Sequence, residues 1–136
     1  MSNAHNQDVL RKVIEEGFNK GNLEALDELF APDVQEHQFG MPAAIDGMKG
    51  SIRGLRSAFP DLTLTIEEMV ADGDKAWARA TARGTHTGPF MGIAPTQRPF
   101  AIQVFDMCRI ENGRIVEHWG VPDRFALMSQ LGALHR

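Results

Sequence analysis

The stretch that decides the fold reads AIQVFDMCRI (101–110), Glu111-Asn112-Gly113 and RIVEHWGVPD (114–123). Two apolar-rich runs flank an Asn-Gly pair, which is the strongest short-range signal for a β-hairpin. Asp106 and His118 are ionisable residues set within these runs. Because a buried ionisable group is costly unless it is paired, these two residues are the first candidates for chemistry.

The length of the hairpin loop decides whether the two side chains meet. With a two-residue Asn112-Gly113 turn, Asp106 falls opposite Trp119. With a three-residue loop that includes Glu111, Asp106 falls opposite His118. We favour the second register because it brings both ionisable groups to one face within side-chain reach. The same face then carries a set of small or apolar residues that could line a pocket: Val104, Cys108, Val116 and Gly120.

The N-terminal part of the chain has helical periodicity. Apolar residues recur at intervals of three or four over 9–18, 23–30 and 44–58, and Gly21, Pro32 and Pro60 punctuate the ends of these segments. A short extended piece, 34–39, lies between the second and third predicted helices. A last helix is expected after Asp123, which would cap it. Helices followed by strands, without βαβ alternation, predict the α+β class.

A period of two begins at Leu62 and breaks at Glu67-Glu68, which predicts a strand with a β-bulge. The next predicted strand, 75–87, carries a row of alanines on one face, at Ala76, Ala78, Ala80 and Ala82. Such small side chains leave room for a closely packed helix or for a cavity. The loop 88–99 that follows contains three prolines and is long enough to act as a lid.

Composition limits the classes of function. A chain of 136 residues with 43% hydrophobic content predicts a single domain, 1–136, with its core at about 8–132. The net charge is −4 and the 14 lysines and arginines form no run, which argues against nucleic-acid binding. No apolar run approaches membrane-spanning length, and the N-terminal region is too polar for a secretion signal. Cys108 is the single cysteine, so we expect no internal disulfide and a cytoplasmic location. The expected partner is a hydrophobic small molecule.

Four segments carry a family resemblance: NKGNLEALDELFAPDVQEH (19–37), IRGLRSAFPDLTLTIEEMVADGDK (52–75), GTHTGPFMGIAPTQR (84–98) and RIENGRIVEHWGVPD (109–123). Together they resemble the SnoaL-like polyketide cyclase family, which shares the nuclear-transport-factor-like cone fold with ketosteroid isomerases. The resemblance implies a cone-shaped, curved, mixed or antiparallel sheet wrapped around the N-terminal helices, with an interior pocket. It also implies a cofactor-free reaction in which a carboxylate removes a proton next to a carbonyl, so that a ring closes by an intramolecular aldol step.

The resemblance leaves two hypotheses for the site. The acid/base aspartate of the family lies two residues beyond the histidine of the last strand; here that histidine is His118 and the later position is Gly120. A second pocket histidine of the family corresponds to Asp106. In the first hypothesis Asp106 and His118 are catalytic, in an enzyme of the cyclase or isomerase type. In the second they are a structural pair, and the chain is a ligand-binding or accessory protein that has lost the family's aspartate.

Other residues complete the expected pocket. His86 corresponds to a family histidine at the pocket mouth, or else it ties the strand end to the loop. His37 either lines the pocket, which we favour, or simply ends its strand. Phe18 is expected to line the pocket and lies where ketosteroid isomerases have a tyrosine. The histidines show no metal-ligand spacing, so no metal is expected, and the resemblance implies that no cofactor is needed. Trp119 should point away from His118, toward a homodimer contact through the outer sheet face.

Overall fold

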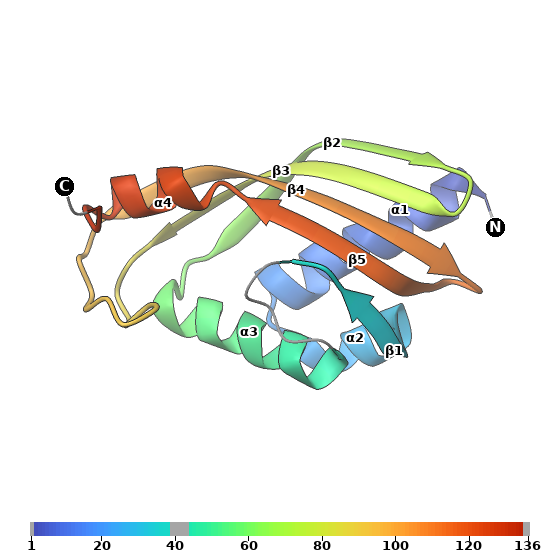
Figure 1. Cartoon of the computed structure of the whole chain (residues 1–136), viewed down its shortest axis with the longest axis horizontal. Coiled ribbons are helices and arrows are strands. Elements are labelled where there is room, and N and C mark those ends of the chain that lie inside the picture. The colour runs from blue at the N-terminus through green and yellow to red at the C-terminus, as the bar shows by residue number, and fades with distance from the viewer. Residues whose placement is uncertain (1, 39–43, 135–136) are drawn as a thin grey trace.

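The computed structural model describes residues 2–38 and 44–134, which form a curved five-stranded sheet with helices packed against it (Figure 1). The elements in chain order are α1 (Asn3–Lys12), the π-helical η1 (Val13–Asn19), η2 (Leu23–Ala25), α2 (Leu26–Leu29), β1 (Phe30–Glu36), α3 (Ile45–Ala58), β2 (Thr63–Asp72), β3 (Lys75–Thr85), β4 (Pro99–Glu111), β5 (Arg114–Pro122) and α4 (Arg124–Gln130). The strand order is β1-β5-β4-β3-β2. β1 runs parallel to β5, and the other neighbours are antiparallel. The predicted α+β class is confirmed.

The N-terminal helix turns its apolar face to the sheet. Val9, Leu10, Val13 and Ile14 are buried, and the helix runs beside β2 and β3 (Figure 1). The chain leaves the helix at Gly21, whose φ of 69° lies in the left-handed region that glycine adopts without strain. The burial of this apolar face against the sheet is the main source of its helical stability.

The strand pattern follows the predicted periods closely. The four alanines of β3 are all buried; α1 packs against this strand, and Ala82 lines a cavity. The pairing of β2 with β3 shifts between Ile66 and Glu68, which confirms the predicted bulge. β1 begins earlier than the predicted extended piece 34–39 and ends at Glu36; the end of that piece lies outside the described residues. Asp123 caps α4 as expected, because its carboxylate accepts the Ala126 N–H at 3.0 Å.

The hairpin turn between β4 and β5 differs from the register we favoured. Asn112 and Gly113 alone form the turn, with φ angles of 52° and 78°, and Glu111 pairs with Arg114. Two consecutive left-handed residues give a turn whose twist matches that of the strands, and Asn-Gly is the pair best suited to it. The predicted three-residue loop is therefore wrong.

A β-bulge in β5 brings Asp106 and His118 to one face of the sheet, although the turn has only two residues. One extra residue, Val116, enters β5, and beyond it Cys108 pairs with His118 and Asp106 pairs with Gly120. An inserted residue reverses the alternation of every side chain after it. Asp106 and His118 consequently share a face, although they are diagonal neighbours and not direct partners. Val116 itself is not a cavity residue.

Candidate active site

A cavity of about 400 Å³ lies between the inner face of the sheet, α3 and the loop after β3. Its walls are mostly apolar, and phenylalanines contribute from several elements: Phe18, Phe59, Phe90 and Phe100. This size and character suit a small, largely apolar ligand. The expected lining residues Phe18 and Val104 are both part of the wall.

Polar side chains at the cavity wall are few. Among the described residues they are Gln38, Ser51, Asp106 and Arg124. Asp106 is the one carboxylate in this part of the wall, and its side chain is 12% exposed. A carboxylate that faces an apolar cavity is a natural candidate for proton transfer.

His118 contacts the Asp106 carboxylate but is not itself part of the cavity wall. His118 Nε2 lies 2.9 Å from Asp106 Oδ1, and His118 Nδ1 lies 2.8 Å from Glu36 Oε2. The Glu36 side chain is fully buried at the end of β1, and His118 is 10% exposed. The three side chains therefore form a line that begins at the cavity and ends in the interior: Asp106, His118 and Glu36.

The two carboxylates keep the imidazole charged. Burial alone would lower the pKa of His118, but hydrogen bonds to Asp106 and Glu36 outweigh burial and raise that pKa to about 9. At neutral pH the imidazolium donates one N–H to each carboxylate. The carboxylate of Asp106 therefore faces the cavity with one oxygen hydrogen-bonded to this ring.

Glu36 was missed by the sequence reasoning, which chose its neighbour His37 instead. Adjacent residues of a strand point to opposite faces, so only one of the two could face inward. The structure places His37 on the outer face of the sheet. There its Nε2 lies 2.8 Å from Glu117 Oε2, and its ring stacks on Trp119 with a centroid distance of 4.8 Å. His37 is therefore not a pocket residue; the outward orientation of Trp119 agrees with the sequence prediction.

His86 lies at the base of the loop and does not line the cavity. Its side chain is fully buried, and its Nδ1 lies 3.0 Å from the Thr96 hydroxyl and 3.3 Å from the Thr96 N–H. Its backbone also binds the far side of the loop, through Arg98 O and the Gln97 N–H. This is the anchoring role that the sequence left as an alternative. The loop then brings Phe90 and Met91 to the cavity wall.

Cys108 and Gly120 lie close to the pair but not on the cavity wall. Cys108 is fully buried, and burial together with the Asp106 charge raises the pKa of its thiol to about 12. Gly120 lies directly opposite Asp106. In the described parts of the chain, no group of three or more His, Cys, Asp or Glu side chains could hold a metal ion. No helix there is long and apolar enough to cross a membrane.

A curved sheet that encloses a cavity beside packed helices, with a carboxylate-histidine pair inside, defines a cone-fold pocket protein. The model of the SnoaL-like polyketide cyclase family matches residues 8–131, so this chain belongs to that family.

Individual relatives agree with this assignment. The chain is 28% identical over 122 residues to the nogalonic acid methyl ester cyclase of Streptomyces nogalater, a match that covers 85% of this chain and 89% of the relative. It resembles the structure of TsrD from Streptomyces laurentii, with a TM-score of 0.90 and 34% identity over 98% of this chain and 99% of the other. It also resembles IdmH from Streptomyces antibioticus, with a TM-score of 0.84 and 39% identity over 93% of this chain and 98% of the other.

Proposed function

We propose that this protein is a cofactor-free enzyme of the cyclase or isomerase type, which transfers a proton next to a carbonyl group of a hydrophobic, polyketide-like small molecule. The observation that carries the proposal is the position of Asp106. It is the one carboxylate on the described cavity wall, and an imidazolium holds it. The ester cyclases among the relatives support the same class of reaction.

The proposed reaction uses Asp106 as both base and acid. One carboxylate oxygen takes a proton from the carbon next to a carbonyl, and the electron pair of that C–H bond forms an enolate. In the aldol case the enolate carbon then attacks a second carbonyl of the same molecule, which forms the ring C–C bond and leaves an alkoxide. The alkoxide takes the proton back from Asp106, so the base is regenerated without a co-reactant.

The buried cluster suits this cycle electrostatically. His118 fixes the Asp106 carboxylate at the cavity wall, and Glu36 keeps His118 protonated. When Asp106 accepts the substrate proton, the negative charge moves from its carboxylate to the enolate. Arg124, on the same cavity wall, contributes a positive charge to that environment.

Deuterium exchange of a model ketone tests the proposal. We expect wild-type protein to accelerate exchange of the α-protons of 1-tetralone in D₂O, followed by proton NMR. Asp106→Asn should reduce this exchange by on the order of 10²-fold or more. The exposed Asp33→Asn is the matched control and should retain the wild-type rate. Exchange no faster than in buffer contradicts an enzymatic role.

The alternative function is ligand binding without turnover. One observation favours it: Gly120 occupies the position that corresponds to the family's acid/base aspartate. Under this alternative, 1-tetralone binds to the cavity but its α-protons exchange at the buffer rate. The same experiment therefore distinguishes the two functions.

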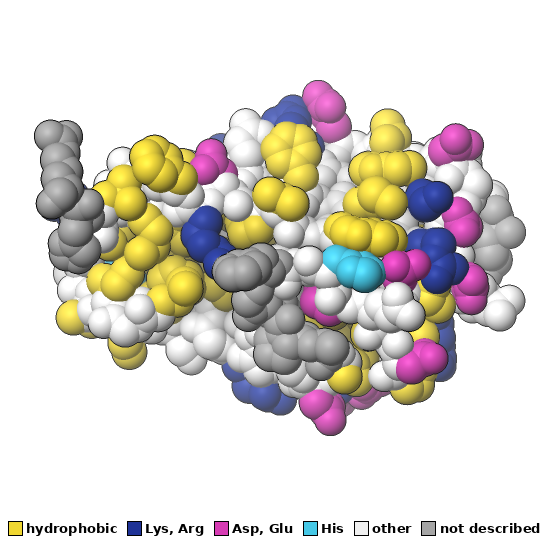
Figure 2. All heavy atoms as spheres, viewed as in Figure 1, with side chains coloured by type: hydrophobic (Ala, Val, Ile, Leu, Met, Phe, Trp, Pro, Cys, Tyr) yellow, Lys and Arg dark blue, Asp and Glu magenta, His cyan; other side chains and the backbone are white. Residues whose placement is uncertain are grey.

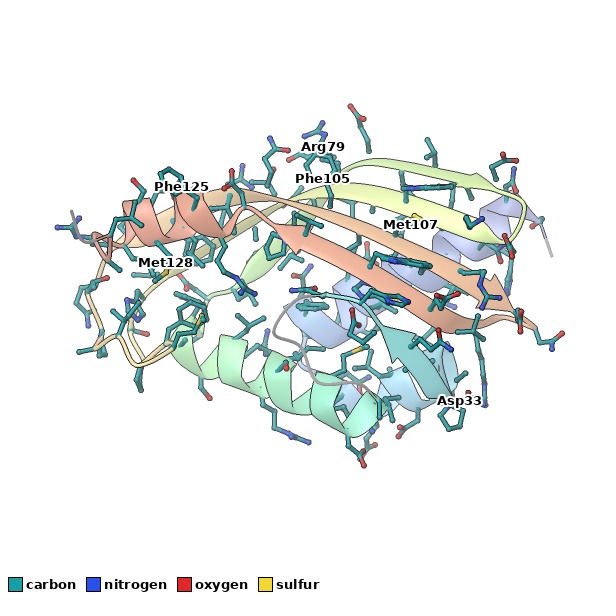
Figure 3. All side chains as sticks on the ribbon, in the orientation of Figure 1. Asp33, Arg79, Phe105, Met107, Phe125 and Met128 are labelled. Atoms are coloured by element: carbon teal, nitrogen blue, oxygen red, sulfur yellow. The ribbon has the colours of Figure 1, made fainter. Side chains whose placement is uncertain are left out.

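The proposal includes a homodimer formed through the outer face of the sheet. Four apolar side chains pair in a row across β2, β3, β4 and β5: Val70, Trp77, Met107 and Trp119. Phe105 and Val121 form a second pair beside this row, with 54% and 66% of their surfaces exposed. We call these six residues the outer apolar surface. Apolar side chains gather over this side of the molecule in Figure 2, and Figure 3 shows Phe105 and Met107 on the side of the sheet away from α3. A contiguous surface of this kind favours burial against a second copy.

A further inference from the structure

We infer that the side-chain amide of Gln38 donates a hydrogen bond to the carbonyl oxygen of the ligand, beside Asp106, and that the absence of a side chain at Gly120 admits the amide there. The inference rests on the proposed function because it names the partner of the carbonyl whose neighbouring proton Asp106 removes. It gives Gln38 a ligand-binding role that the sequence did not suggest.

The amide lies in the space that a side chain at position 120 would occupy. A Cβ placed on Gly120 would be 2.3 Å from Gln38 Oε1, 3.0 Å from His118 Cε1 and 3.1 Å from Asp106 Oδ1. One point in space therefore touches all three side chains. The end of the Gln38 side chain therefore lies within a few ångströms of the hydrogen-bonded pair that presents Asp106 to the cavity.

The backbone of Gln38 is tied to the same cluster. Its N–H donates to Glu36 Oε1 at 2.9 Å, and Glu36 in turn binds His118. Gln38 also lines the cavity, as Asp106 does. The backbone of Gln38 is thus fixed beside the buried cluster, while its side chain reaches the cavity wall.

The proposed reaction needs a hydrogen-bond donor to the carbonyl oxygen of the ligand, beside Asp106. As the enolate forms, negative charge develops on the carbonyl oxygen, and a neutral donor stabilises it. An ionised Asp106 can only accept hydrogen bonds, whereas an amide has two N–H donors. Rotation about the terminal bond of Gln38 turns either its oxygen or its nitrogen toward the cavity. A carboxylate at position 120 would instead repel Asp106.

Two substitutions test the inference from opposite sides. Gln38→Leu removes the donor and keeps a similar volume. Gly120→Ala leaves Gln38 intact but displaces it, because the new Cβ would fall 2.3 Å from the end of that flexible side chain. Gln35→Leu is the matched control, because Gln35 is an exposed glutamine of the same strand. Infrared spectra of bound 1-tetralone labelled with ¹³C at the carbonyl report the hydrogen bond directly.

We expect the carbonyl band to move to higher wavenumber in Gln38→Leu and in Gly120→Ala, while Gln35→Leu keeps the wild-type band. The deuterium-exchange rate should fall in the same two variants, by on the order of 10²-fold, as for loss of one oxyanion donor. If Asp106-dependent exchange is intact but Gln38→Leu leaves the band unchanged, the inference is overturned and the proposed function stands. If the wild-type protein does not bind the ketone, both are overturned.

Discussion

His118 Nε2 lies 2.9 Å from Asp106 Oδ1, although the two residues are not partners in the β4–β5 register. Cys108 is the partner of His118, and Gly120 is the partner of Asp106. Residues that are diagonal neighbours on one face of a sheet can still touch through long side chains. Here Gly120, the direct partner of Asp106, has no side chain that could block the contact with His118. The contact that presents the candidate base therefore depends on the bulge at Val116.

The charge on Glu36 should control the pKa of His118. Glu36→Gln keeps the size of the side chain and removes a fully buried negative charge next to the imidazole. We expect the pKa of His118, measured by NMR titration of its ring protons, to fall clearly below about 9. Exchange catalysis should decline too, although Glu36 is not a cavity-wall residue.

Glu117→Gln is the control for this experiment. Glu117 lies on the outer face of β5, the strand that carries His118, and its carboxylate contacts His37, so the substitution makes the same chemical change beside another histidine. The pKa of His118 should not move in this variant. An unchanged His118 titration in Glu36→Gln would contradict the three-residue cluster.

Stability should depend on pH through His118. The folded pKa of about 9 lies above the ordinary value of 6.5, so the imidazolium stabilises the fold fully below pH 6.5 and loses this contribution as the pH rises through 9. The difference spans roughly 3 kcal/mol at most. Urea denaturation between pH 6 and 10 should show this decline in wild-type protein and not in His118→Asn. If the difference in free energy of unfolding between the two proteins does not change with pH, the raised pKa of His118 is contradicted.

The overall fold followed from the sequence because its signals are local. The alanine face of β3, the bulge after Ile66 and the cap at Asp123 each depend on neighbouring residues. The Asn-Gly turn was also visible, but the bulge at Val116 was not, since an inserted apolar residue leaves no composition signal. We predicted the contact between Asp106 and His118 from a three-residue loop that does not form. The contact exists because the extra residue in β5 has the same effect on side-chain alternation as the extra loop residue would have had.

The candidate site could be predicted only in part. Asp106 and His118 lie on one hairpin, whereas Glu36 comes from a strand that pairs with β5 across 82 residues. No local pattern states that β1 is parallel to β5, so the sequence could not distinguish Glu36 from His37 as the inward residue. Gln38 was missed for the same reason, because its place follows from the end of β1.

The anchor between His86 and Thr96 should hold the loop that covers the cavity. Thr96→Val removes the hydroxyl 3.0 Å from His86 Nδ1. We expect a loss of about 1 kcal/mol in stability and faster amide exchange over residues 88–98. Ligand binding should weaken as well, because Phe90 and Met91 of this loop line the cavity. The exposed Thr87→Val serves as control; equal exchange in both variants would contradict the anchor.

The outer apolar surface should mediate dimerisation. Phe105→Glu places a charge within this surface, beside the central row, on a side chain that is 54% exposed and therefore tolerates the change in the monomer. Light scattering should report a dimer for the wild-type protein and a monomer for this variant. Phe125→Glu, on α4, is the control: it changes an equally apolar side chain that is 73% exposed and should leave the dimer intact. A wild-type monomer at micromolar concentration would contradict the proposal.

The thiol of Cys108 should be inert in the folded protein. Burial and the Asp106 charge raise its pKa to about 12, so almost none is thiolate at neutral pH. We expect no reaction with an aromatic disulfide reagent over the time in which the urea-unfolded chain reacts completely. Rapid modification of the native protein would show that this side of the β4–β5 face opens to solvent.

The parallel pairing of β1 with β5 links two events that are usually separate. Glu36 reaches His118 only when the edge strand is attached, because 82 residues of chain separate them. Detachment of β1 leaves the imidazole with the single carboxylate of its own hairpin, and the proton is then held less tightly. By linkage, each proton bound at His118 favours the attached strand to the same extent. Closure of a sheet edge and protonation of one buried ring are therefore a single coupled equilibrium.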